Sequence, residues 1–225
     1  MNMTTQNCVG SKMQSCRNPQ QSLPLMLREL EALAKKHDGD AAMCLGVYYL
    51  TGTLYSLGND DDVAFQRRRG FKDSNKAERF LRIAWKTNFK EAAYYLSWLF
   101  YEMQAPSKAY YWASKAVKYV EKDLKAICYH AMGYLLYNYC SCATAPQRAI
   151  ANWRKAARLG SAPSMIELGT IYFYGENVKR DGRLAALWLG KCINSCRQTG
   201  KDKACAVEAE RLLCRLNGNR AKCWA

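Results

Sequence analysis

The segment at 164–175, SMIELGTIYFYG, contains the pattern that decides the fold. Similar segments rich in Ala, Leu and aromatic residues occur three more times, as AAMCLGVYYLTG at 41–52, AAYYLSWLFYEM at 92–103 and CYHAMGYLLYNY at 128–139. Superposing Gly46, Ser97, Gly133 and Gly169 gives steps of 51, 36 and 36 residues. A period of this length predicts a stack of helical repeats, in which each unit buries its apolar face against its neighbours.

Each segment is followed by a second helix-like stretch with two small residues seven positions apart. Seven residues make about two helical turns, so the two small side chains share one face and let a neighbouring helix approach closely. The pairs are Ala77 and Ala84, Ala109 and Ala116, Ala149 and Ala156, and Ala185 and Cys192. An aromatic residue follows three or four positions after the first small residue in every pair: Phe80, Trp112, Trp153 and Trp188. Large side chains set against small ones are typical of interlocking helix pairs.

Proline and glycine mark the expected helix boundaries. Pro106 and Pro146 fall where the second helix of a unit should begin, and proline is tolerated there because its missing N–H would have no partner. Gly160 follows the run AARL at 156–159 and suits a helix stop in the left-handed conformation.

These residues resemble the Sel1-like repeat, a relative of the tetratricopeptide repeat. The shared pattern is LG-x-x-Y near the end of a first helix, then G, then a basic residue with A, and then AA-x-x-G. The fourth unit fits best, with Leu168, Gly169, Tyr172, Gly175, Val178, Asp181 and Ala185. The third supplies AARLG at 156–160, and the first has Leu45, Gly46, Tyr49 and Gly52. The second departs, because Ser97 replaces the glycine and no glycine follows Tyr101.

The resemblance covers 40–195 and implies an all-α fold, a right-handed α/α solenoid of about four helix pairs with a capping helix at each end. The stretch at 22–37, SLPLMLRELEALAKKH, is amphipathic and suits the first cap. We expect a disordered tail over 1–21, an N-terminal capping helix over 22–39, repeats over 40–88, 89–122, 123–160 and 161–195, and a Cys-rich C-terminal capping helix and tail over 196–225.

The net charge is +15, from 34 Lys and Arg against 19 Asp and Glu. A field of this size favours acidic partners, whether protein, nucleic acid or anionic membrane. Within the repeats, the second helices carry more basic residues than the first helices: Lys76, Arg79, Arg82, Lys86, Lys108, Lys115, Lys118, Arg148, Arg154, Lys155 and Arg158.

The first helices are crowded with aromatic residues instead. In arrays similar to this one, first helices line the concave surface and second helices the convex one, which implies an aromatic groove and a basic outer face. Most of the rings must pack in the core, and roughly a third should reach the groove as anchors for a partner. The candidates are Tyr48, Tyr94, Trp98, Tyr101, Tyr134, Tyr137 and Tyr172.

The first unit carries about fifteen extra residues between its helices, within TLYSLGNDDDVAFQRRRGFK at 53–72. Long loops in compact repeats are often functional or disordered. Arg67, Arg68 and Arg69 can bind phosphate or an acidic protein surface. The alternative is a solvated loop whose acidic and basic halves partly neutralise each other.

Catalytic chemistry has little support in the sequence. The two histidines are His37 and His130, and His130 follows Cys128 by two helical positions, so their side chains point about 200° apart. No Gly-rich phosphate loop, GxSxG elbow or HExxH helix occurs. We predict no enzyme, no catalytic residue and no cofactor.

Five of the eleven cysteines lie in the last 34 residues: Cys192, Cys196, Cys205, Cys214 and Cys223. They can be reduced packing thiols, disulfide staples of the C-terminal helices, or, for Cys192, Cys196 and Cys205, metal ligands. The spacings at 140–142 and 192–196 differ from the usual zinc patterns, so we predict no metal site. Some exported Sel1-like proteins staple their helix pairs with disulfides.

The first twenty residues contain no apolar stretch of the signal-peptide kind, and no apolar run reaches the ~18–20 residues of a membrane helix. We therefore predict a cytoplasmic protein without a transmembrane segment, with export as the alternative if the cysteines are paired.

The leading functional hypothesis is a non-enzymatic scaffold that binds an acidic protein partner. The resemblance implies adaptor roles, including that of bacterial immunity-type proteins that neutralise a toxin. The alternative hypothesis is a nucleic-acid-binding protein that acts through its basic convex face and the loop of Arg67, Arg68 and Arg69.

Overall fold

A computed structural model describes residues 23–54, 68–69 and 72–218, and every structural statement refers to these residues. They form ten α-helices and one short strand pair. The helices are α1 (Leu23–Lys35), α2 (Gly39–Thr51), α3 (Ser74–Lys86), α4 (Ala92–Glu102), α5 (Pro106–Ala116), α6 (Lys122–Tyr139), α7 (Ala145–Arg158), α8 (Ala162–Tyr174), α9 (Gly182–Thr199) and α10 (Lys203–Leu216). The expected tail over 1–21 lies outside the described residues.

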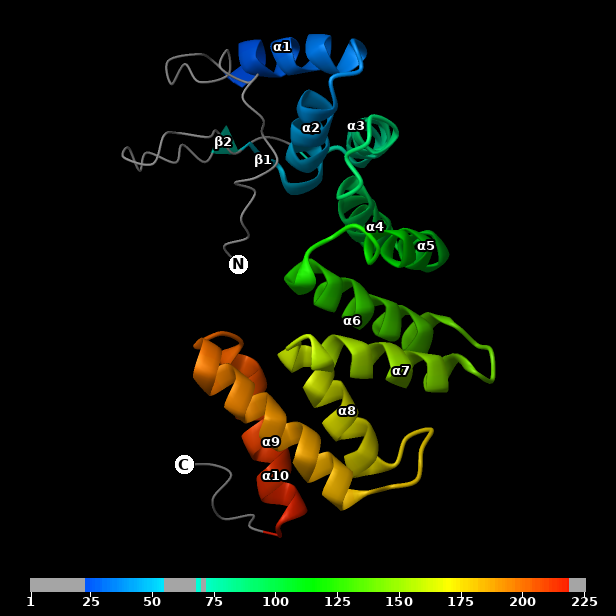
Figure 1. Ribbon diagram of the computed structural model, residues 1–225, viewed down its shortest axis with the longest axis vertical. Coiled ribbons are helices and arrows are strands. Elements are labelled where there is room, and N and C mark those ends of the chain that lie inside the picture. Colours follow the sequence, from blue (N-terminus) through cyan, green and yellow to red (C-terminus); the bar gives the residue numbers. More distant parts are fainter. Residues whose placement is uncertain (1–22, 55–67, 70–71, 219–225) are drawn as a thin grey trace. The chain divides into compact units, whose positions relative to one another are not determined.

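Helices that follow one another along the chain pack in pairs, α2 with α3, α4 with α5, α6 with α7 and α8 with α9 (Figure 1). One further helix flanks the pairs at each end, since α1 packs on α2 and α10 packs on α9 and α8. The predicted all-α repeat fold is therefore confirmed. The chain divides into two compact units, Met1–Tyr119 and Val120–Ala225.

The helix pairs come close where a first helix lacks a side chain. A Cβ placed on Gly46 would lie 2.6 Å from Leu81 Cδ2, one on Gly133 2.5 Å from Trp153 Nε1, and one on Gly169 2.6 Å from Leu189 Cδ2. Leu81, Trp153 and Leu189 each stand four residues after the first small residue of their own second helix. The recurring glycine is thus the position over which a large buried side chain of the second helix packs.

The second pair replaces this glycine with Ser97 and keeps the close packing in a different way. The equivalent position on its second helix is Ala113, a small residue where the other pairs have leucine or tryptophan. Ser97 is 7% exposed and its hydroxyl donates to the Ala109 carbonyl at 3.1 Å. A small side chain opposite the serine therefore accompanies the loss of the glycine.

The first and fourth pairs begin their second helices with the same contacts. The backbone N–H of Asp73 donates to the Tyr49 carbonyl, and that of Asp181 donates to the Tyr172 carbonyl, each at 2.9 Å. Each aspartate also caps its helix, because its carboxylate accepts from backbone N–H groups of the first turn. In the first pair these contacts of Asp73 form although about fifteen extra residues precede it. At the base of this insertion, β1 (Thr53–Leu54) pairs antiparallel with β2 (Arg68–Arg69).

The end of the fourth pair differs from the expected boundary at 195, because α9 continues to Thr199. The helix stops at Gly200, which has a left-handed φ of 66° and donates its N–H to the Cys196 carbonyl. The other repeat boundaries stay predictions. Among the described helices, none is both long and apolar enough to cross a membrane.

Candidate partner-binding surface

Helix α4 exposes aromatic side chains on one face. Trp98 is 36% exposed and Tyr101 45% exposed, while Tyr94 and Tyr95 are half-buried beside them. We call these four residues the α4 aromatic face. Their spacing of three and four residues places them on one side of the helix. The opposite side is buried in the first unit and consists of Ala92, Ala93, Leu96, Leu99 and Phe100.

Polar contacts orient the rings of the α4 aromatic face. The indole Nε1–H of Trp98 donates to Glu102 Oε1 at 3.0 Å, and the other carboxylate oxygen pairs with Lys72 Nζ at 3.5 Å. Tyr94 and Tyr95 meet edge to face, with ring centroids 5.1 Å apart. The indole N–H is thus satisfied within the chain, and the apolar part of the ring is what α4 offers to a partner.

Two of the seven groove candidates lie in the core instead. Tyr48 is 4% and Tyr172 6% exposed, and burial raises the pKa of Tyr48. The Tyr172 hydroxyl accepts a hydrogen bond from Arg154 of α7, the second helix of the preceding pair. Tyr48 stands two positions after Gly46, and Tyr172 stands three positions after Gly169. These two tyrosines therefore contribute packing rather than surface.

Tyr134 and Tyr137 of α6 are half-buried. The Tyr137 hydroxyl donates to Glu176 Oε2 at 3.0 Å and accepts from Asn177 Nδ2 at 3.1 Å, which ties α6 to the turn after α8. Burial raises the pKa of Tyr137, the Asn177 hydrogen bond lowers it, and Glu176 raises it further. Tyr134 lies beside the exposed Tyr139, with centroids 6.3 Å apart.

The repeat itself shows which first-helix positions reach the surface. Two positions after the superposed glycine or serine are half-buried or exposed in every pair. The residues one position after it are Val47, Trp98, Tyr134 and Thr170, and those five positions after it are Thr51, Glu102, Asn138 and Tyr174. Sequence reasoning missed Tyr174, Tyr139 and Met103, which are 51%, 55% and 42% exposed. Helical spacing from Trp98 would have found Tyr174, because the two positions belong to the same stripe.

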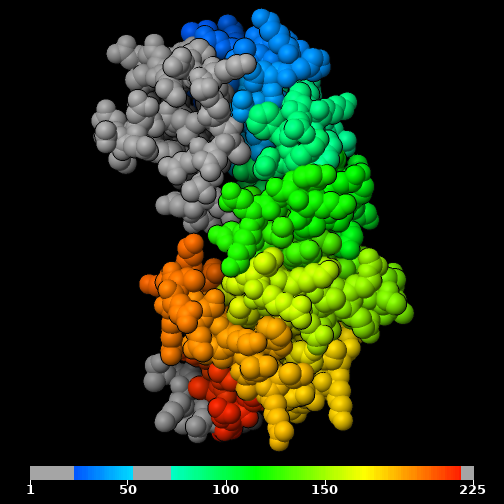
Figure 2. Space-filling model, in the orientation of Figure 1, coloured from blue at the N-terminus to red at the C-terminus, as the bar shows by residue number. Residues whose placement is uncertain are grey.

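The second helices carry exposed cations. We call the exposed cations of α3 and α7 the basic stripes: Lys76, Arg79, Arg82 and Lys86 on α3, and Arg148, Arg154, Lys155 and Arg158 on α7. Several cations lie over aromatic rings, with Lys76 Nζ 4.9 Å from the centroid of Tyr49 and Lys155 Nζ 5.3 Å from that of Tyr129. Helix α7 contains no acidic residue and lies on the face of its unit seen in Figure 2, coloured yellow-green.

The basic loop is only partly placed. Arg67 lies outside the described residues, and for Arg68 and Arg69 the structure describes the backbone alone, paired with Leu54 and Thr53. Their role as a binding site stays a prediction.

One histidine makes a buried polar contact. His130 Nδ1 lies 2.9 Å from the Ser164 hydroxyl, and burial lowers the pKa of His130. A nucleophile must reach its substrate, whereas Ser164 is 0% exposed. The contact therefore links α6 to α8. His37 is exposed and apart from this network.

Of the C-terminal cysteines that the structure describes, Cys192 and Cys196 are buried and Cys205 and Cys214 are half-buried. Burial raises the pKa of Cys192 to about 12, with further contributions from Cys196 and Cys205, so these three side chains lie close together between α9 and α10. No group of three or more His, Cys, Asp or Glu side chains in the described parts of the chain is arranged to hold a metal ion.

Comparison with known proteins gives matches among solved structures. A Sel1 repeat protein from Oxalobacter formigenes is 16% identical, with a TM-score of 0.58 over 84% of this chain and 66% of the other. A protective antigen of uropathogenic Escherichia coli strains, c5321, which displays an SLR fold, is 20% identical, with a TM-score of 0.55 over 83% of this chain and 40% of the other. No known family and no curated protein matches the sequence.

These likenesses concern the fold. The chain has the Sel1-like repeat fold that its LG-x-x-Y and AA-x-x-G segments predicted, and it spans less than two thirds of either protein's length.

Proposed function

We propose that the chain is a protein-binding scaffold without catalytic activity of its own, and that it holds an acidic partner protein. The observation that carries this proposal is the α4 aromatic face, where Trp98 and Tyr101 are exposed side by side with Tyr94. Exposed aromatic side chains lose favourable burial unless something covers them, and Trp and Tyr are enriched among the residues that dominate binding energy. The Sel1-like repeat fold also supports a protein-binding scaffold, because repeat folds present extended binding surfaces.

Charge supports the acidic nature of the partner. The net charge of +15 and the exposed basic stripes create a positive field that speeds the encounter with a negatively charged protein. The aromatic rings then supply most of the binding energy at short range, because apolar contact is little affected by salt. An adaptor, or an immunity-type protein that neutralises an acidic toxin, would use its surface in this way.

The test begins with affinity purification of the intact chain from its own organism, with nuclease treatment and mass spectrometry of the bound protein. Trp98→Ala and Tyr101→Ala should each weaken binding of that protein by about tenfold or more, with the midpoint of thermal unfolding nearly unchanged. Tyr48→Ala is the matched control, because Tyr48 is buried in the equivalent first helix and its loss should lower the unfolding midpoint.

Two results would contradict the scaffold proposal. One is a Trp98→Ala protein that binds its partner as well as the unchanged chain. The other is a loss of binding that is proportional to the loss of stability in Trp98→Ala, Tyr101→Ala and Tyr48→Ala. That result would show that Trp98 and Tyr101 contribute to packing and not to partner contact.

A nucleic-acid partner is the second candidate, favoured by the basic stripe of α7 and its lack of acidic residues. Phosphate contacts release counterions, so binding should fall steeply with salt. Arg158→Ala together with Lys155→Ala should then lower affinity for a nucleic acid and reduce its salt slope by about 2. Absence of binding at low salt would eliminate this candidate.

A further inference from the structure

Two cysteines lie together in the connection between α6 and α7. Cys140 follows the last residue of α6 with an extended backbone, φ −110° and ψ 117°, and Thr144 is the residue before α7. The sulfur atoms of Cys140 and Cys142 are 3.2 Å apart. A disulfide requires about 2.05 Å, so the two atoms need to move by only about 1 Å to form one.

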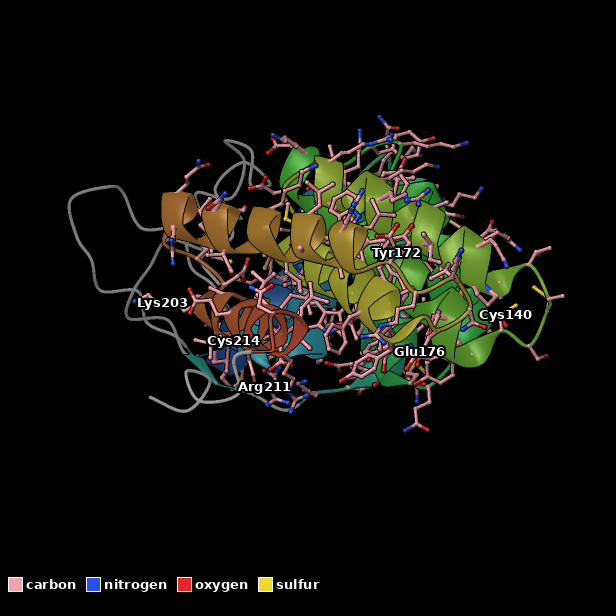
Figure 3. All side chains as sticks on the ribbon, turned by 90° about the horizontal axis from the view of Figure 1, so that it is seen from below. Cys140, Tyr172, Glu176, Lys203, Arg211 and Cys214 are labelled. Carbon is pink, nitrogen blue, oxygen red and sulfur yellow. The ribbon has the colours of Figure 1, made fainter. Side chains whose placement is uncertain are left out.

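This pair is accessible. Cys142 is exposed and Cys140 half-buried. Figure 3 shows Cys140 on the connection at one edge of the unit, far from Cys214 on α10. A reagent or a protein can therefore reach Cys142 without any opening of the helix pairs.

The surroundings of Cys142 favour its thiolate form. Hydrogen bonds from Cys140 and Thr144 lower the pKa of Cys142, desolvation opposes them, and the positive charge of Arg148 adds a further lowering. The Thr144 hydroxyl lies 3.7 Å from its sulfur. Cys142 also lies three residues before Ala145, the first residue of α7, and the unpaired backbone N–H groups at a helix N-terminus favour a nearby negative charge.

The other described cysteines are less accessible than Cys142. Burial raises the pKa of Cys128 and of Cys192 to about 12, and it also raises that of Cys205. Cys196 is 5% exposed and its thiol contacts the Asp202 carbonyl. Among the cysteines that the structure describes, Cys142 is thus the one that combines exposure, a favoured thiolate and a second thiol within reach.

We propose that Cys140 and Cys142 form a thiol–disulfide exchange site, in which Cys142 attacks an external disulfide and Cys140 resolves the product. The Cys142 thiolate attacks one sulfur of the external disulfide, whose S–S bond breaks as a new bond forms to Cys142. Cys140 then attacks the Cys142 sulfur, which closes the Cys140–Cys142 disulfide and releases the second external thiolate. The dithiol loses two electrons and two protons, and the external disulfide gains both as two thiols.

The full-length protein tests this proposal with glutathione as the probe. After equilibration over a series of ratios of reduced to oxidised glutathione, free thiols are alkylated and the peptide that contains 140–142 is analysed by mass spectrometry. A mass loss of about 2 Da, two hydrogens, marks the internal disulfide. It should form in oxidised glutathione and disappear as the reduced form is raised.

Two single substitutions separate the roles of the thiols. Cys140→Ser should accumulate a mixed disulfide of glutathione on Cys142, because the resolving thiol is missing. Cys142→Ser should react with oxidised glutathione at least about tenfold more slowly at neutral pH, because the remaining thiol, Cys140, is half-buried and less accessible than Cys142. Equal rates for the two variants would overturn the assignment of roles.

Arg148 and Arg158 provide a matched pair on one helix. Arg148→Ala should slow alkylation of Cys142 by iodoacetamide roughly two- to fivefold near neutral pH, whereas Arg158→Ala at the far end of α7 should leave the rate unchanged. Three results would overturn the proposal. The first is that Cys140 and Cys142 stay reduced in oxidised glutathione, and the second is that their disulfide resists reduction and is therefore only structural. The third is that Cys142 forms a disulfide with a different cysteine of the chain.

Discussion

Gly133 sits at the closest approach of α6 and α7, against the side chain of Trp153, which is 1% exposed and donates its indole N–H to the His130 carbonyl at 3.2 Å. An added methyl group would lie 2.5 Å from the indole nitrogen, so the ring or the helix has to move. Gly133→Ala should therefore lower the free energy of unfolding by about 1–3 kcal/mol, as measured by denaturant unfolding.

Gly190 of α9 supplies the control, because a Cβ there would meet nothing within 4 Å. Gly190→Ala should raise the free energy of unfolding by up to about 1 kcal/mol, since alanine favours the helix over glycine. If Gly133→Ala also raised the free energy of unfolding, close packing against Trp153 would not explain the glycine at 133.

Protonation of His130 should destabilise the fold in mild acid. Burial lowers the pKa of His130 below its usual 6.5, so the unfolded chain binds more protons than the folded one between the two values. Stability should therefore fall as the pH is lowered from about 6.5 through the folded pKa. The measurement is the unfolding midpoint against pH for the unchanged chain and for His130→Gln, which should lose this part of the slope.

Glu167 acts in the opposite direction and needs its own control. Burial raises the pKa of its carboxyl above 4.5, so the folded chain binds more protons there and stability falls as the pH rises through this range. The His130 effect is best measured in a Glu167→Gln background. An unchanged slope after His130→Gln in that background would show that His130 titrates alike in the folded and unfolded chains.

At the scale of the elements, the α4–α5 pair keeps its close packing with a serine in place of the recurring glycine. The other pairs place Leu81, Trp153 or Leu189 opposite a glycine, and this pair has Ala113 opposite Ser97. Large residues face glycine and small residues face serine, so each helix pair is a matched unit.

A double-mutant cycle tests this match. Ala113→Leu should lower the free energy of unfolding by about 1–3 kcal/mol because the leucine overpacks against Ser97. Ser97→Gly should also destabilise, because it removes the hydrogen bond to the Ala109 carbonyl and leaves a void. The double variant recreates the pattern of the other pairs, with a large side chain opposite a glycine. Its loss of unfolding free energy should therefore be smaller than the sum of the losses in the two single variants. Additive effects would refute the match.

At the scale of the whole molecule, each helix contacts only its near neighbours within a unit, so local opening should be graded along the chain. Helix α3 packs against both α2 and α4, whereas α1 packs on α2 alone and α10 buries only Ala209 and Leu212. Hydrogen exchange measured by mass spectrometry should therefore be slowest in α3 and fastest in α1 and α10. Uniform protection over these three helices would indicate a single cooperative core instead.

The sequence by itself determined the fold. The spacing of Gly46, Gly133 and Gly169 and the small residues seven apart in the second helices predicted paired helices, because a period of this size has few ways to bury its apolar faces. It also singled out Trp98 and Tyr101, which the structure places at the surface.

Only the tertiary structure decided which aromatic residues are core. Tyr48 and Tyr101 occur in similar segments, yet one is 4% and the other 45% exposed, because the side of a helix that is buried depends on where its neighbours pack. The same holds for the cysteines. The spacing at 140–142 matched no metal pattern, and only the path of the chain from α6 into α7 brings the two sulfur atoms to 3.2 Å at an accessible position.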